Sequence, residues 1–241
     1  MMLADFHVHS TFSDGKLAIA DVVDLYGRAG FGAIAITDHI AESTTWIGRA
    51  TAFAGLAVTE TNFRKYLEAV EAQAERAWDR YRMVVIPGVE LSKNYISNRR
   101  SAHILGIGIS DWISADPDPL DICQSIRAQG GLAVAAHPVS TRKQEKQTYH
   151  LWDRREELRN SFDAWEVASG PHLFPEVLNS DLPMLANSDF HVARQLRAWK
   201  TLLECERHPD AILRAVRQQE LRFHFYEPPA ELIDGRLWQY A

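Results

Sequence analysis

Histidine and carboxylate side chains fall repeatedly at the ends of short apolar runs in this 241-residue chain. The first run ends in His7-Val8-His9, and this spacing places two imidazoles on the same face of an extended strand. Groups of the same kind follow or open later apolar runs, and the full set is His7, His9, Asp14, His39, Glu90, His103, His137, Asp189 and His191. Such groups in one pocket would repel one another or stay unpaired unless cations lay among them. Nitrogen and oxygen ligands without thiolate suit Zn, Mn, Fe or Co, so the residues predict a metal centre.

Each of these motifs alone also has an ordinary structural explanation. A single His-x-His on a strand is weak evidence for a metal site. Thr37-Asp38-His39 is equally typical of a helix cap, and His-Pro and Asp-x-His are common sequences. The feature that favours metal binding is their shared position, because structural histidines have no reason to fall at the ends of successive strands.

The elements that must position these groups alternate between short apolar runs and longer amphipathic stretches, which predicts β-α units around a parallel sheet or barrel. Strands are expected at residues 3–8, 32–37, 83–86, 102–109, 132–136, 164–168, 183–186, 201–204 and 221–225. Helices are expected at residues 20–29, 60–80, 120–129, 152–159 and 209–219. The carboxyl ends of barrel strands converge on one face, so at least eight of the nine groups would meet there and His103 would reach them from its own strand. Residues 43–59 are expected to form an extended loop, either a lid over the site or a plain surface excursion.

Composition and charge narrow the range of functions. Hydrophobic residues make up 46% of the chain and charged residues 24%, as in an ordinary globular protein. The net charge of −6 argues against an extended nucleic-acid interface. Two cysteines, Cys123 and Cys205, cannot build a disulfide framework and favour the cytoplasm.

The sequence gives no support for an exported protein, a membrane protein or a protein of several domains. The N-terminal MMLADFHVHS has neither the basic nor the apolar region of a cleaved signal. No apolar run approaches the roughly 20 residues that span a bilayer, so no membrane partner is expected. No repeat or linker divides the chain, and a single domain over residues 1–241 is therefore expected.

At this point the sequence resembles the PHP (polymerase and histidinol phosphatase) superfamily. The motifs that carry the resemblance are DFHVHSTFSDG, TDH, PGVELS, HILGIG, AAHP and NSDFH, in this order over residues 5–191. The resemblance implies a distorted (β/α)7 barrel, an α/β fold of the TIM-like type, with two or three divalent metal ions (Zn, Mn or Fe) at its carboxyl face. It implies a first metal held by His7, His9, Glu90 and Asp189, a second held by Glu90 as a bridge with His103 and His137, and a third held by Asp14, His39 and His191.

The activity that the resemblance implies is that of a phosphoesterase. The enzyme would be a phosphatase or phosphodiesterase that hydrolyses a small phosphorylated metabolite, a nucleotide or an oligonucleotide end through a metal-bridging hydroxide. His191 and Asp38 are the candidates for passing a proton to the leaving group, although ligation would occupy His191, and Asp38 is better suited to orienting the ligands.

Side chains that would contact a substrate are harder to identify from the sequence. Arg142 and Arg194 follow the AHP and SDFH motifs and are the candidates for binding substrate phosphate, with solvated loop charges as the alternative. Four aromatic residues are candidates for stacking on a ring of the substrate: Trp46, Phe53, Trp152 and Phe190. For Trp152 a place on an amphipathic helix face is the more ordinary interpretation.

Two other functions stay open from the sequence. Amidohydrolase-type barrels hydrolyse C–N or C–O bonds with similar metal sites, but they bridge their metals with a strand-borne lysine where this chain has Glu90. A metal-stabilised binding module without catalysis is the other, and the complete ligand set argues against it. The sequence leaves open the substrate, the choice between monoester and diester, the native metal and the oligomeric state.

Overall fold

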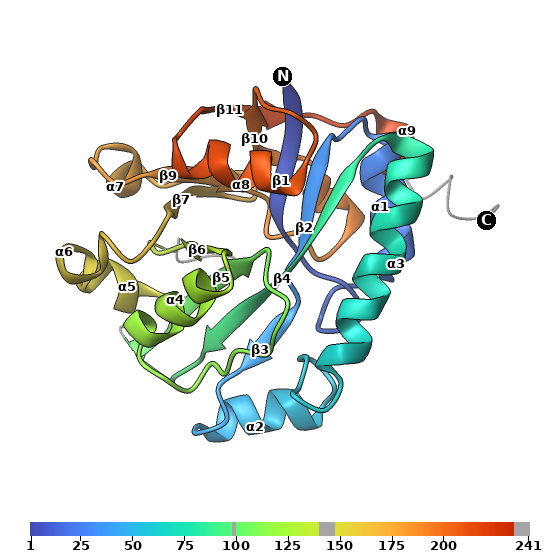
Figure 1. Cartoon of the computed structure of the whole chain (residues 1–241). Helices are drawn as coiled ribbons and strands as arrows, with labels where there is room; N and C mark the ends of the chain where they lie inside the picture. The colour runs from blue at the N-terminus through green and yellow to red at the C-terminus, as the bar shows by residue number, and fades with distance from the viewer. Residues whose placement is uncertain (98–99, 140–147, 234–241) are drawn as a thin grey trace.

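The strands of the protein form one curled sheet with helices packed against it (Figure 1). The computed structural model describes residues 1–97, 100–139 and 148–233. Its strands are β1 (Met2–Val8), β2 (Ala33–Ile36), β3 (His39–Ala41), β4 (Val84–Lys93), β5 (Ala102–Ile107), β6 (Leu132–Ala135), β7 (Ala164–Ser169), β8 (His172–Leu173), β9 (Met184–Asn187), β10 (Ala198–Leu203) and β11 (Leu221–Tyr226). The nine predicted strands are thus present, and β3 and β8 were not foreseen.

The helices occupy the segments between these strands. They are α1 (Ile19–Arg28), α2 (Trp46–Phe53), α3 (Phe63–Tyr81), α4 (Pro119–Ala128), α5 (Tyr149–Asp153), α6 (Arg155–Leu158), α7 (Pro175–Leu178), the 3-10 turn η2 (Ala193–Leu196), α8 (Pro209–Arg217) and α9 (Ala230–Ile233). The helix expected at residues 152–159 is two short helices, α5 and α6. Among the described residues, no helix has the length and apolar character needed to cross a membrane.

The order and direction of the strands make the barrel a distorted one. The order is β11-β10-β1-β2-β4-β5-β6-β7-β8, with β3 beside β4 and β9 beside β7. Neighbours β1, β2 and β4 are parallel, but β5 runs antiparallel to both β4 and β6, and β10 runs antiparallel to β1. The expected distorted α/β barrel is confirmed, whereas the expectation of a parallel sheet throughout was wrong. Because β5 is reversed, its first residues lie at the same edge as the carboxyl end of β4.

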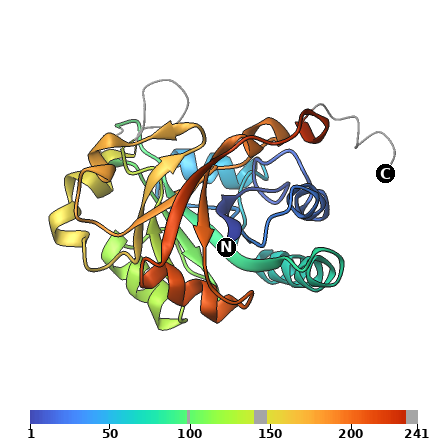
Figure 2. The same cartoon turned by 90° about the horizontal axis from the view of Figure 1, so that it is seen from above.

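Two apolar clusters hold the sheet in place. In the larger, α1 and α3 lie side by side against the sheet and bury Val22, Tyr26 and Val70 (Figure 2). The smaller joins alternate strand residues, such as Ala4 and Phe6 of β1, to Ile212 of α8. Because side chains alternate along a strand, Asp5 and His7, which follow Ala4 and Phe6, point away from that cluster. Polar groups of β1 are therefore buried at the opposite face.

The segment 43–59 contains a helix, α2, where an extended loop was expected. Its first turn is capped by the Thr45 hydroxyl, which accepts a hydrogen bond from the Gly48 amide at 3.1 Å. A Cβ atom at position 48 would lie 1.8 Å from the Glu42 carbonyl oxygen, so only glycine fits this approach of helix to strand. The Ala/Thr-rich composition concealed the helix, because its apolar pattern is weak.

Candidate metal centre

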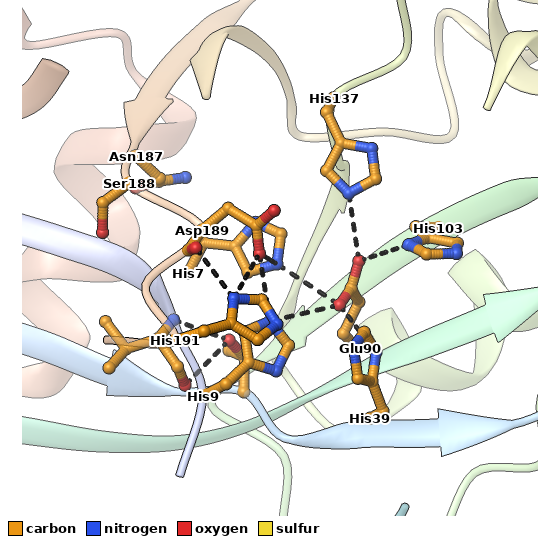
Figure 3. Close-up of polar contacts among 12 residues, drawn as sticks. His7, His9, His39, Glu90, His103, His137, Asn187, Ser188, Asp189 and His191 are labelled. Atoms are coloured by element: carbon orange, nitrogen blue, oxygen red, sulfur yellow. Dashed lines mark hydrogen bonds and ion pairs between the residues drawn. The ribbon is translucent and has the colours of Figure 1, made fainter. Parts of the chain in front are cut away.

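All nine predicted ligands lie in the described part of the chain and meet at one edge of the sheet, and Figure 3 labels all of them except Asp14. Strand pairing explains the convergence, because His39 of β3 is directly opposite Glu90 of β4, and His103 of β5 is opposite Ser92 two residues further along β4. The others come from β1, from the loop after it, or from the turns after β6 and β9: His7, His9, Asp14, His137, Asp189 and His191.

Their ligand atoms form three overlapping groups, in each of which the atoms lie within 4.8 Å of one another. The first group is His7, His9 and Asp189, the second is His7, Glu90 and His137, and the third is His9, Asp14, His39 and His191. These groups overlap with the ligand sets that the resemblance implied, but Glu90 is not in the first, His7 takes the place of His103 in the second, and the third also contains His9. His103 belongs to none of them; its Nδ1 lies 2.7 Å from Glu90 Oε1 and its Nε2 lies 3.1 Å from Asn94 Oδ1. Its role as a ligand stays a prediction.

Glu90 lies between the groups and presents one oxygen to each side (Figure 3). Its Oε1 faces His103 and His137, with the His137 Nε2 atom at 3.3 Å. Its Oε2 lies 3.3 Å from both His7 Nε2 and His9 Nε2. A carboxylate placed in this way is suited to bridge two cations, which is the role predicted for Glu90.

The third group is the exposed side of the centre. Asp14 Oδ1 lies 3.1 Å from His191 Nε2 and 3.5 Å from His39 Nε2. The Asp14 side chain is 38% exposed, whereas those of His9 and Glu90 are fully buried. A molecule from solvent therefore reaches the centre from the side of Asp14.

Unsatisfied buried atoms test whether a cation fits here. His7 Nε2, His9 Nε2, Asp14 Oδ1 and Glu90 Oε2 are buried and have no hydrogen-bond partner. Buried polar atoms in proteins are ordinarily hydrogen-bonded, so four such atoms directed at a common space need another partner. Imidazole nitrogens and carboxylate oxygens are ligands of Zn, Mn and Fe, and a divalent cation thus fits the cluster.

The charges of the cluster are strongly coupled. Burial disfavours the charged form of His191, but the nearby Asp14 and Asp189 carboxylates outweigh it and raise the pKa of His191 to about 9. Burial likewise opposes ionisation of Glu90, yet the surrounding His39, His103 and His7 hold the pKa of its carboxyl well below the usual range. In His103 burial dominates, and it lowers the pKa of that imidazole to about 4.

These pKa values predict that metal binding releases protons. His191 is protonated at pH 7 in the metal-free protein, and a metal binds only the unprotonated imidazole. The apparent affinity for Mn²⁺ should therefore fall as the pH drops below about 9, by about tenfold per pH unit for each proton displaced. Calorimetry at pH 7 in two buffers of different ionisation enthalpy measures the number of protons released.

The matched variant for this prediction is Asp14→Asn, which removes the carboxylate that stabilises the charged His191. It should release fewer protons at pH 7 than the unmodified chain. Equal heats in the two buffers for the unmodified chain, which mean no proton release, would contradict the prediction.

Glu166 of β7 is a buried carboxylate that the sequence analysis missed. Its Oε1 lies 2.9 Å from His7 Nδ1, its Oε2 accepts the His137 amide at 2.7 Å, and the Asn187 side-chain amide donates to Oε1 at 2.9 Å. The contact with Nδ1 directs His7 Nε2 toward the cluster, as second carboxylates do for metal-bound imidazoles. One signal was available, because Glu166 is an acid in the middle of the apolar run AWEVAS.

Replacing Glu166 is expected to weaken metal binding. Glu166→Ala should lower the affinity for the metal, or the activity, by about 10- to 100-fold. The metal affinity of Glu166→Gln should fall between those of the unmodified chain and Glu166→Ala. A Gln oxygen still accepts from His7, but the Gln amide nitrogen cannot accept from the His137 backbone. Competition with a chromophoric chelator measures the affinity, and the exposed Glu176→Gln is the control. Unchanged affinity in Glu166→Ala would show that Glu166 does not orient His7.

Asp38 is fully buried and fixes the loop between His9 and Asp14. Its carboxylate accepts hydrogen bonds from the Ser10 amide at 2.8 Å, the Ser10 hydroxyl at 2.7 Å and the Ser13 hydroxyl at 2.6 Å. Ser13 in turn lies 3.4 Å from His9 Nδ1. These contacts give Asp38 the geometry of a residue that positions ligands, the second of the two roles considered for it.

Two ligands have a backbone conformation that side chains rarely adopt. The φ angles of His137 and Asp189 are 27° and 51°. Such conformations cost about 1–3 kcal/mol each and persist where the surroundings enforce them. At His137, the Glu166 carboxylate binds the amide, and the Thr148 hydroxyl donates to the carbonyl at 2.7 Å.

Next to Asp189, a buried ionic network holds the chain in place. The Ser188 amide donates to Asp5 Oδ1 at 3.0 Å, and Asp5 Oδ2 accepts from the Ser188 hydroxyl, from Tyr26 and from the Lys200 ammonium. Asp5 and Lys200 are fully buried. This network ties β1 and β10 to the turn that presents Asp189.

The structure places the residues predicted to contact a substrate in different environments. Arg194 is exposed in η2, directly after His191, while Arg142 lies outside the described residues. Phe190 is fully buried against Tyr26, so its expected stacking on a substrate was wrong. Trp152 packs edge-on against Trp165 at 6.3 Å, which supports its ordinary interpretation as part of a helix face.

Two solved structures resemble the whole fold. A two-domain protein from Bacteroides vulgatus that contains a predicted PHP-like metal-dependent phosphoesterase superposes with a TM-score of 0.65 and 23% identity, over 93% of this chain and 65% of the other. An amidohydrolase from Chromobacterium violaceum, with bound sulfate, superposes with a TM-score of 0.51 and 20% identity over 78% of this chain and 87% of the other. Both show the fold.

Comparison with known sequences gives the family. Among curated proteins, the phosphoribosyl 1,2-cyclic phosphate 1,2-diphosphodiesterase of Eggerthella lenta is 29% identical over 114 residues. This alignment covers 47% of the chain and spans about a third of that relative, 34% of its length. The family model of the PHP domain matches residues 5–178, well over half of the chain, and Asp189 and His191 follow just beyond the matched range. The chain therefore belongs to the PHP domain family.

Proposed function

We propose that this chain is a metal-dependent phosphoesterase that acts on a small phosphorylated molecule. The observation that carries the proposal is the buried Glu90 carboxylate, which presents one oxygen to His137 and the other to His7 and His9. This arrangement supports two divalent cations, and the exposed Asp14 group supports a third. Such cations supply a nucleophilic hydroxide at neutral pH and neutralise charge on phosphoryl oxygens.

The side chains around the centre have separate proposed roles. The phosphoryl group would enter from the side of Asp14, because the ligands behind it are buried. Arg194 follows the candidate ligand His191 and is exposed, so it is our candidate in the described chain for binding phosphate. Arg142, which lies outside the described residues, is the second candidate. His191 is the candidate for passing a proton to the leaving group, and Asp38 positions the loop that carries Asp14.

The relatives support phosphate esters over amides as substrates. The Eggerthella protein is a cyclic-phosphate diphosphodiesterase, and the Bacteroides protein contains a predicted phosphoesterase. The Chromobacterium amidohydrolase keeps C–N hydrolysis as the competing outcome. The two cysteines and the net charge of −6 support a cytoplasmic enzyme with a small substrate and no extended nucleic-acid partner.

The direct test is an assay of protein loaded separately with Mn, Zn and Fe. Phosphomonoesters are followed by release of inorganic phosphate, diesters by formation of the monoester, and amides by release of the amine. Turnover of phosphate esters that is lost in Asp189→Ala supports the proposal. Absence of phosphate-ester turnover with all three metals, or hydrolysis of amides alone, would overturn it.

A further inference from the structure

A cavity of about 490 Å³ lies beside the metal centre. It is lined by Trp46 and Thr45 at the start of α2, and by Asn94, Tyr95, Ile96 and Arg100 between β4 and β5. These segments adjoin the strands that carry His39, Glu90 and His103. The cavity is therefore at the same edge of the sheet as the ligands.

Asn94 connects the cavity to the centre. Its side-chain oxygen lies 3.1 Å from His103 Nε2, and the other nitrogen of the same ring lies 2.7 Å from Glu90 Oε1. One imidazole thus separates the wall of the cavity from the bridging carboxylate. The cavity is therefore joined to the centre through Asn94 and His103.

The aromatic wall of the cavity is held in place by buried groups. The Tyr95 hydroxyl donates to Glu42 Oε1 at 2.9 Å, and the Tyr95 amide donates to the Ser101 hydroxyl at 3.0 Å. Glu42 is 2% exposed, and its Oε1 also accepts from the Lys93 ammonium at 3.1 Å. The Tyr95 ring is therefore fixed before any ligand binds, which lowers the entropic cost of binding.

The other apolar side chains of the cavity face water. Trp46 is 65% exposed and Ile96 is 85% exposed. Large apolar groups gain most when a ligand covers them, and an indole ring favours a flat partner. A flat ring is thus the ligand that this wall fits best.

Two arginines, Arg49 and Arg100, line the cavity. The Arg100 guanidinium lies 4.6 Å from the centre of the Tyr95 ring, and no carboxylate in the described part of the chain forms an ion pair with it. Arg49, by contrast, donates to the carbonyl oxygens of Ser43 and Thr44. A guanidinium that is stacked and still open to an anion is suited to bind a carboxylate or phosphate in two places.

We propose that this cavity binds the leaving group of the phosphoester and selects one with a flat aromatic ring that carries an anionic substituent. Trp46 and Tyr95 would cover the ring, and Arg100 would bind the anion. A volume near 490 Å³ suits one ring system with its substituents and is too small for a polymer. This inference rests on the proposed phosphoesterase function.

The test compares three phosphate monoesters of primary alcohols: ethyl phosphate, benzyl phosphate and 4-carboxybenzyl phosphate. The metal-loaded chain should prefer them in increasing order. Trp46→Ala should lower kcat/KM for both benzyl esters by about 10-fold and leave ethyl phosphate within about twofold. Arg100→Gln should lower kcat/KM for the carboxybenzyl ester alone, also by about 10-fold.

Trp78→Ala is the matched control, because it makes the same substitution at a tryptophan of α3 that is 41% exposed and does not line the cavity. It should leave all three values unchanged. Equal preference for the three esters, or equal losses in Trp46→Ala and Trp78→Ala, would overturn the proposed leaving-group site while leaving the phosphoesterase function in place.

Calorimetry separates failure of the site from failure of the function. Benzylphosphonate and methylphosphonate bind without turnover, and benzylphosphonate should bind the metal-loaded chain about 10-fold more tightly, with the difference lost in Trp46→Ala. If no ester is hydrolysed but this difference is found, the cavity is a ligand site and the proposed function is wrong. If the two phosphonates bind equally, the inference is wrong whatever the activity.

Discussion

Replacing Glu90 with glutamine is expected to reduce phosphoesterase kcat/KM by on the order of 1000-fold or more. The amide has nearly the same shape but only one good acceptor atom and no charge, so it cannot present an oxygen to His137 and another to His7 and His9. Loss of the bridge should also remove one bound cation. Metal content by mass spectrometry and kcat/KM with a phosphomonoester are measured on the same sample.

The control for this variant is Glu71→Gln, which removes the same charge from the exposed face of α3. It should keep full activity and metal content. Near-normal activity in Glu90→Gln at normal metal content would mean that the carboxylate does not bridge cations. Circular dichroism shows whether Glu90→Gln is still folded. If it is not, Asp189→Ala provides the second test, at a candidate ligand that is partly exposed.

The candidate ligands could be predicted from the sequence because each one depends on a local rule. His7 and His9 lie two residues apart at the end of a strand, and His137 and Asp189 each lie two residues beyond the end of a short buried strand. Where a strand ends is visible in the apolar pattern, and strand ends gather at one edge of a barrel. No knowledge of which strands are neighbours was needed.

The supporting residues could not be found in this way, because their roles depend on which strands are neighbours. Glu166 supports His7 although the two residues are 159 positions apart. The acid in the apolar run AWEVAS shows that a charge is buried in this strand but not what it contacts, and the packing of β7 beside β6 brings the carboxylate to the centre. Lys200 was hidden for the same reason, since a lysine in a strand is usually solvated.

The direction of β5 could also not be predicted from the apolar pattern of the sequence. Apolar runs predict that a strand exists and not which way it runs. Because β5 is antiparallel to β4, His103, the second residue of β5, lies beside Glu90. Arg100, just before the strand, lies at the rim of the cavity. The reversal therefore creates both the position of His103 and the wall beside it.

Lys200→Met is expected to lower the free energy of unfolding by about 3–5 kcal/mol. Burial lowers the pKa of Lys200 and Asp5 opposes this shift, so the two groups stabilise each other's charge inside the protein. Removing the ammonium leaves the Asp5 carboxylate buried without a cation, and the remaining hydrogen bonds from Tyr26 and Ser188 compensate only in part. Urea unfolding followed by tryptophan fluorescence measures the change.

The double variant Asp5→Asn with Lys200→Met separates the charge from the packing. Because it leaves no unpaired charge, it should recover most of the lost stability, whereas Lys65→Met on the exposed face of α3 should change stability by less than about 0.5 kcal/mol. Metal affinity should follow the same order, since Asp5 holds Ser188 and with it the strained turn at Asp189. A Lys200→Met protein as stable as the unmodified chain would show that the buried pair does not hold this turn, and the geometry of Asp189 would then have to come from β9 alone.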